Sequence, residues 1–245
     1  MQALESAMQK FERPHHQRIS KVLQALNGPL LKEHECYFAG GTAIALRYGE
    51  YRESVDIDFL ISSLEQYRTL RNLLTEQAGI SAIVRADANP LQQIGDIRAD
   101  QYGIRTKVRM ENSTIKFEIV LEGRIQLATP GVNDEIAGIT ALCPLDMATS
   151  KLLANADRWR DDGVFSRDII DLAMMNPRLP LLREAVAKAE TAYGQSVLQS
   201  LEKAIDRLQD HDNGWLDRCM MVMDVNVPKA MVWKQLNNLK KVLPK

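Results

Sequence analysis

The chain has 245 residues, enough for one large domain or two modest ones with a buried core. Its 31 Lys and Arg residues nearly balance its 32 Asp and Glu residues, and the formal charge of -1 provides no global field that would draw it to nucleic acid or a membrane. Any binding site for a polyanion must therefore be local. The three widely spaced cysteines argue against a disulfide framework and against a Cys-x-x-Cys metal site.

The N-terminal stretch MQALESAMQKFERPHH has no apolar signal core, and no segment elsewhere approaches the roughly 18 apolar residues of a membrane span. Together with the cysteine usage, this predicts a soluble cytoplasmic protein. His15 and His16 have no Cys or His partner at a metal-site spacing, so both are expected to be exposed at the start of a helix.

Apolar residues at helical spacing over 15–31 predict one opening helix that ends at Asn27-Gly28-Pro29. The elements expected next are a strand over 36–38, a short helix over 42–48, a strand over 54–61, an amphipathic helix over 64–78 and strands within 81–128.

Two segments of alternating apolar and polar residues, 104–110 and 115–121, flank Asn112-Ser113. They predict a hairpin with a two-residue turn at Asn112-Ser113. In this register Lys107 lies opposite Glu118 on the polar face, where the two side chains can form an ion pair.

Beyond Pro144 the pattern is helical almost to the end. Breaks are expected near Asp161-Gly163, Asn176-Pro177, Gly194, Asn213-Gly214 and Val227-Pro228. The predicted organisation is an α+β or α/β half over residues 1–140 and a helical half over 141–245.

Asp56 and Asp58 stand two residues apart on the strand expected over 54–61, so their side chains point to the same face. Two carboxylates this close repel each other unless a cation neutralises them, and a hard ion such as Mg²⁺ prefers oxygen ligands. The alternative is an exposed strand end without a ligand, which is the commoner meaning of an isolated Asp-x-Asp.

Gly40, Gly41 and Thr42 open the next helix upstream, where free N–H groups, a hydroxyl and the positive end of the helix dipole can bind an anion. The alternative is a glycine turn that lets the strand and the helix pack closely, with Thr42 as N-cap. In combination with Asp-x-Asp, the motif predicts a phosphate cradle beside a metal site.

The stretch GGTAIALRYGEYRESVDIDFLI resembles the active-site signature of the DNA polymerase beta-like nucleotidyltransferase superfamily, in particular the AbiEii-type toxin nucleotidyltransferases. The family pattern Arg-x-Ser-x-Asp-Ile/Leu-Asp is matched by Arg52, Ser54, Asp56 and Asp58. A second stretch, SKLLANADRWRDDGVFSRDIIDLAMM at 150–175, is similar to a Lys…Arg…Arg/Lys-Asp-x-x-Asp block of that family.

This resemblance implies a polymerase-beta-like core with a small mixed sheet, and transfer of a nucleoside monophosphate from an NTP to an acceptor hydroxyl. It implies two Mg²⁺ ions, with Mn²⁺ as a substitute, held by Asp56, Asp58 and a third carboxylate on the neighbouring strand. Glu118 is the only acid inside that strand, so a role as ligand and an ion pair with Lys107 are both open.

Lys151 and Arg158 lie seven residues apart on one helix face, which by itself suits a solvated polar surface. The resemblance implies that Lys151 binds the triphosphate and that Arg158 supports it. Arg167, Asp168 and Asp171 follow on the next helix, where an internal ion pair and a substrate role are equally open.

The catalytic residues implied are thus Asp56, Asp58, Glu118 and Lys151, and the nucleotide-binding residues are Gly40, Gly41, Thr42, Arg52, Ser54, Lys151 and Arg158. The resemblance suggests the toxin of an AbiE-like pair with a cognate antitoxin, acting on the end of a tRNA or other RNA, or on a protein. The alternatives are a nucleotidyltransferase that modifies a small molecule, and a catalytically idle relative that binds a nucleotide or a partner.

Overall fold

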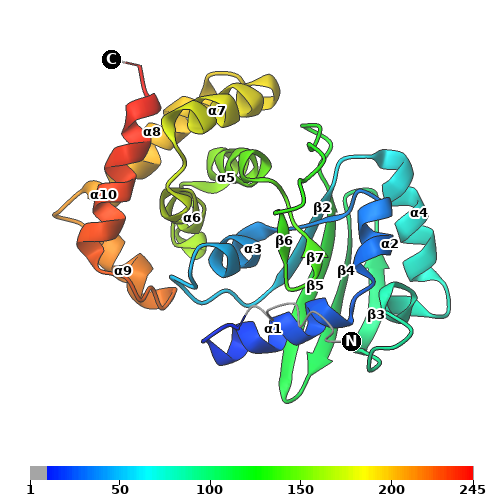
Figure 1. Ribbon diagram of the computed structural model, residues 1–245. Helices are drawn as coiled ribbons and strands as arrows, with labels where there is room; N and C mark the ends of the chain where they lie inside the picture. The colour runs from blue at the N-terminus through cyan, green and yellow to red at the C-terminus, as the bar shows by residue number, and fades with distance from the viewer. Residues whose placement is uncertain (1–9, 245) are drawn as a thin grey trace, which may run out of the picture.

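A five-stranded mixed sheet forms the first part of the computed structural model, which describes residues 10–244 (Figure 1). The first nine residues, which make up much of the stretch inspected for a signal core, lie outside the described residues. In spatial order the strands are β1 (Tyr37–Ala39), β2 (Ile57–Ile61), β5 (Ser113–Leu121), β4 (Gly103–Met110) and β3 (Gln92–Ala99). The pair β2–β5 is parallel and the other pairs are antiparallel.

One face of β1, β2, β5 and β4 is largely apolar and buried, because alternate residues of these strands point to it, whereas the edge strand β3 has no buried residue. Phe38, Phe59 and Phe117 form a row across β1, β2 and β5, with ring centroids 5.7 and 5.5 Å apart. The helices α1 (Pro14–Ala25), α3 (Gly40–Arg47) and α4 (Leu64–Thr75) pack against these strands. The other face carries Asp58 and Glu118, which are directly opposite each other on β2 and β5.

The second part of the chain is helical and gathers on the side of the sheet occupied by α5 and α6 in Figure 1. Its elements are α5 (Pro144–Arg158), η2 (Asp162–Val164), α6 (Arg167–Met175), α7 (Leu179–Tyr193), α8 (Ser196–Gln209), α9 (Trp215–Val222), α10 (Lys229–Leu239) and η3 (Lys240–Val242). All five expected helix breaks are confirmed. None of the helices in the described chain is long and apolar enough to cross a membrane.

The predicted opening helix is confirmed as α1, which ends at Ala25, just before the expected stop at Asn27-Gly28-Pro29, but the helix that follows this stop was not predicted. Leu26 is extended at the end of α1, and a separate helix, α2 (Gly28–Glu33), follows it. The side chain of Asn27 accepts the N–H of Leu30, so the residues read as a helix stop also act as the N-cap of α2. The short elements η1 (Gly79–Ile83), β6 (Glu135–Ile136) and β7 (Ile139–Thr140) had no clear sequence signal.

The β4–β5 hairpin turns one residue earlier than predicted, because Met110 pairs with Ser113 and the turn is Glu111-Asn112. Glu111 adopts a left-handed φ of 55°, and its carboxylate binds Arg18 and Lys21 of α1. The alternation of buried and exposed residues is preserved, but every cross-strand partner changes. The predicted pair of Lys107 with Glu118 is therefore wrong.

Strand β2 begins at Ile57, three residues later than predicted. Asp56 thus lies at the end of a loop that precedes the strand. Val55, just before Asp56, is 49% exposed, whereas Ile57 and Phe59 on the strand itself are buried. Tertiary contacts from Thr42 and His16 hold this loop in place.

Candidate active site

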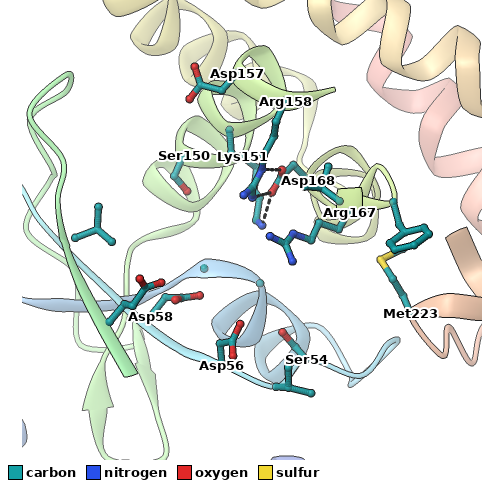
Figure 2. A pocket seen from close by; sticks show the side chains of 18 of the residues that line it. Ser54, Asp56, Asp58, Ser150, Lys151, Asp157, Arg158, Arg167, Asp168 and Met223 are labelled. Carbon is teal, nitrogen blue, oxygen red and sulfur yellow. Dashed lines mark hydrogen bonds and ion pairs between the residues drawn. The ribbon is translucent and has the colours of Figure 1, made fainter. Parts of the chain in front are cut away.

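A cavity of about 640 Å³ lies between the polar face of β2–β5 and the helices α5 and α6 (Figure 2). The start of α3 and the loop before β2 complete its wall. Of the predicted site residues, those that line it are Gly40, Gly41, Arg52, Ser54, Asp56, Asp58, Glu118, Lys151 and Arg158. The fold therefore collects residues that are up to 118 positions apart in the chain.

Asp56 and Asp58 both face this cavity (Figure 2). Within residues 10–244 the backbone carbonyl of Asp56 accepts a hydrogen bond, but no donor binds the side-chain carboxylate of Asp56 or of Asp58. Burial, together with the charges of Asp56 and Glu118, raises the pKa of Asp58 to about 6. The two carboxylates therefore lack the neutralising partners that their surroundings require.

Paired oxygen donors without protein partners fit a hard divalent cation such as Mg²⁺. Nonetheless, in the described part of the chain no three Asp, Glu, His or Cys side chains are close enough together to hold an ion as they stand. Asp56 and Asp58 fit as ligands, and a third carboxylate would have to move toward them.

Glu118 is the nearest candidate for that third carboxylate, since its Cα is paired with that of Asp58. Its carboxylate instead accepts from Arg105 Nε at 3.0 Å and from Lys116 Nζ at 2.5 Å. The ion pair expected at Glu118 is thus present with different cations, as the shifted register requires. Glu118 must exchange these half-exposed partners before it can bind a metal ion.

We expect Glu118→Gln to lower the free energy of unfolding by at most about 1 kcal/mol, because ion pairs with half-exposed cations contribute little. Nucleotidyl transfer should fall by orders of magnitude if the carboxylate is a metal ligand. Urea unfolding and turnover at saturating Mg²⁺ measure the two effects. Glu118→Asp is the matched variant, and near-normal turnover of Glu118→Gln would leave the ion pair as the residue's role.

Gly40 and Gly41 allow two side chains to approach the start of α3 closely. A Cβ on Gly40, whose φ is +73°, would lie 2.4 Å from Oδ2 of Asp58, and one on Gly41 would lie 2.2 Å from Nη2 of Arg52. Helix α3 has no side-chain cap, so the N–H groups of its first turn are free to bind an anion at the cavity. The close-packing role of the glycines is therefore observed, and it is compatible with the anion site.

Thr42 does not line the cavity and is only 1% exposed. Its hydroxyl donates to the carbonyl of Asp56 at 2.5 Å and lies 2.8 Å from the hydroxyl of Ser54. The side chain of Thr42 thus holds the loop that presents Asp56, while the cavity receives only the backbone of this helix turn.

The expectation that both histidines are exposed is wrong for His16, which is fully buried. Nδ1 of His16 donates to Glu50 at 2.8 Å, and Nε2 accepts the backbone N–H of Ser54 at 3.1 Å. Nε2 of His15, which is half-buried, donates to the carbonyl of Val55. The two histidines of α1 therefore hold the loop just before Asp56 through hydrogen bonds to its backbone. The spacing of metal ligands in the sequence gives no sign of such a role.

Burial lowers the pKa of His16, although Glu50 acts in the opposite direction. The neutral ring therefore stabilises the fold above its unfolded pKa of about 6.5, and this contribution is lost as the pH falls further. We expect His16→Phe to be less stable than wild type at pH 8, with the difference shrinking toward pH 5 in urea unfolding. His211→Phe, at an exposed ring that contacts Trp233 in a tilted arrangement, is the control, and a pH-independent difference would contradict the assignment.

Lys151 is 6% exposed and lies between two acids of α6. Its Nζ is 2.9 Å from Asp168 and 2.7 Å from Asp171. Burial alone would lower the pKa of Lys151, but these two charges outweigh it and raise that pKa. Arg158 also binds Asp168, so the internal ion pair expected between C-terminal helices is confirmed for Asp168.

Asp171 joins the two halves of the chain. It accepts from Nε and Nη2 of Arg52 at 2.6 and 2.9 Å and from the hydroxyl of Tyr51 at 2.6 Å. Arg52 was expected to bind nucleotide. Two nitrogens of its guanidinium instead bind the carboxylate of Asp171, although its side chain still borders the cavity.

Arg167 extends into the cavity on the side of Asp56, as Figure 2 shows. Among residues 10–244 it has no ion-pair partner, because Asp168 and Asp171 bind other cations. Lys116, Arg124 and Ser150 line the cavity as well and were not singled out from the sequence. Their spacing carries no motif. The alternation of β5 could have indicated Lys116 and the face of α5 could have indicated Ser150, whereas Arg124 lies between these elements and had no signal.

A mixed sheet and a helical half that meet at paired aspartates and a glycine-led helix place the chain in the nucleotidyltransferase class. The model of the family described as "Nucleotidyl transferase AbiEii toxin, Type IV TA system" matches residues 21–231. The chain belongs to this family, and the expected family, fold class and enzyme class are confirmed. Membership implies a nucleotide substrate and a cognate antitoxin.

Two solved structures share the fold over almost the whole chain. The crystal structure of JHP933 from Helicobacter pylori has a TM-score of 0.53 at 16% identity and covers 95% of both chains. An H. pylori protein provisionally named a nucleotidyltransferase has a TM-score of 0.53 at 15% identity, over 95% of this chain and 97% of that one. Such low identities show the fold alone, and no curated protein matches this chain.

Proposed function

We propose that the protein transfers a nucleoside monophosphate from an NTP to an acceptor hydroxyl at the end of an RNA such as tRNA, or on a protein, with Mg²⁺ held by Asp56 and Asp58. The observation that carries this proposal is the pair of carboxylates without hydrogen-bond donors, beside the uncapped start of α3. A module that only binds a partner would gain nothing from two uncompensated carboxylates in a cavity.

Different residues of the chain bind different parts of the substrate. The N–H groups at Gly40 and Gly41 bind the terminal phosphates, which lie at the positive end of the α3 dipole. Asp56 and Asp58 hold the cation, which when bound neutralises phosphate charge and lowers the pKa of the attacking hydroxyl. Glu118, released from Arg105 and Lys116, is placed to complete the ligand set or to accept the proton of that hydroxyl.

Two cations of the helical half supply positive charge to the leaving pyrophosphate. Lys151 is fixed in position by Asp168 and Asp171, so it costs no reorganisation when the charge develops. Arg167 projects into the cavity and is free to contact a phosphate oxygen directly. Arg158 and Arg52 support this arrangement through the same two aspartates.

The test is to incubate the purified protein with Mg²⁺, each α-labelled NTP in turn, and total cell RNA or total cell protein. We expect label to appear in one macromolecular fraction for the wild type and in none for Asp56→Asn. Label that appears only in small molecules would favour the small-molecule enzyme. An inactive protein that still binds NTP would favour the idle relative.

A further inference from the structure

The polar face of the sheet continues from the cavity across β5, β4 and β3. Paired residues share a face, and so does every second residue of a strand. Asp58 and Glu118 therefore lie on the same surface as Lys116 of β5 and as Arg105, Lys107 and Arg109 of β4. That surface carries five cations, which we call the basic sheet face: Arg98, Arg105, Lys107, Arg109 and Lys116. The chain as a whole has no excess of positive charge, so this concentration is local.

Like charges oppose each other directly in this face. Lys107 is paired with Lys116 across β4–β5, and Arg98 with Arg105 across β3–β4. Such pairs destabilise a sheet. Two of the nearby acids, Glu118 and Asp100, are already bound to Arg105 or Lys116.

The remaining cations, Arg98, Lys107 and Arg109, are exposed and form no ion pair with any residue from 10 to 244. Arg98 lies on the edge strand β3, but protection of a sheet edge does not account for Lys107 and Arg109, which lie on β4 with a strand on each side. The repulsive pair of Lys107 and Lys116 on the interior strands β4 and β5 indicates a ligand that supplies the missing negative charge.

We propose that the basic sheet face binds the phosphodiester backbone of the nucleic-acid acceptor and leads its hydroxyl end to Asp56 and Asp58. This proposal rests on the proposed function and selects RNA over protein as the acceptor. Lys116 connects the two regions, because it belongs to the face and also lines the cavity. From Arg109 to Arg105 the face runs about 14 Å along β4, at the usual rise per residue, which is room for several phosphates.

The test measures binding of a short 5′-fluorescein-labelled RNA with a free 3′ end, by anisotropy over a KCl series. Lys107→Glu with Arg109→Glu removes two unpaired cations that lie outside the cavity. The matched control is Lys203→Glu with Lys234→Glu, which makes the same charge change at exposed positions on α8 and α10. Lys107→Gln with Arg109→Gln removes the same two charges without reversing them, and it serves as the second variant if the glutamate double variant does not fold.

We expect the wild type and the control variant to bind the RNA with equal affinity. The charge-reversal variant, Lys107→Glu with Arg109→Glu, should bind the RNA at least tenfold more weakly near 0.1 M KCl. The slope of log K against log [KCl] should be shallower by about 1.4 in the glutamine variant, at roughly 0.7 per phosphate contact on a single strand. Transfer to RNA should show a raised KM for the acceptor with little change in kcat.

Equal RNA affinity of the reversal and the control would overturn the proposal, and so would binding of polyglutamate as tight as that of RNA. The latter result would favour an acidic protein as the ligand. Both experiments read binding without catalysis. The proposed function is judged separately, from NTP-dependent labelling by the wild type, so the two can fail independently.

Discussion

Asp58→Asn is expected to abolish nucleotidyl transfer and, without Mg²⁺, to raise the stability of the protein at pH 7. The pKa of Asp58 is about 6 in the folded protein and near 3.8 when unfolded, so folding takes up a proton between these values. Stability is therefore lost as the pH rises through 6, and above it the charged carboxylate costs roughly 3 kcal/mol. Asparagine removes this cost together with the charge that holds the ion.

Urea unfolding from pH 4 to pH 8, with and without Mg²⁺, measures both effects. Mg²⁺ should stabilise the wild type, because it binds only the folded state, and should leave Asp58→Asn unchanged. Asp87→Asn, at an exposed carboxylate, is the control. If Asp56→Asn and Asp58→Asn both kept full transfer activity, these residues could not be the metal site.

Much of the fold follows from local sequence. Alternation set the two faces of β4 and β5, and Gly and Pro marked every break in the helical half. The turn at Glu111-Asn112 was missed because Asn favours a left-handed φ more than Glu does, whereas contacts with Arg18 and Lys21 hold Glu111 there.

The residues of the candidate site were better predicted than their contacts. The family resemblance brought Asp56, Asp58 and Lys151 together in one site, and all three line the cavity, but their surroundings depend on residues far away in the sequence. The hydrogen bond between His16 and Ser54 joins residues 38 positions apart in the sequence, and the one between Asp171 and Arg52 joins residues 119 positions apart. The division at residue 140 stays a prediction, and the contact between Asp171 and Arg52 crosses it.

Asp171→Asn is expected to produce the largest loss of stability among these variants. Asp171 is fully buried and is held by two cations, Arg52 and Lys151, that are themselves buried. Burial would raise the pKa of Asp171, but the two cations outweigh it and keep that pKa below its ordinary value. The isosteric amide keeps the shape of the site and leaves Arg52 without a carboxylate partner among the described residues.

Breaking a buried ion pair in this way costs about 3–5 kcal/mol, which should lower Tm by roughly 10 °C in a chain of this size. Asp157→Asn is the matched control, because its pair with Arg124 is half exposed and should contribute about 1 kcal/mol or less. A double-mutant cycle with Arg52→Gln separates the ion pair from the other contacts of Asp171. If Asp171→Asn were as stable as Asp157→Asn, the network could not be what joins α6 to the loop of Arg52, and the alignment of Lys151 with the carboxylates would need another cause.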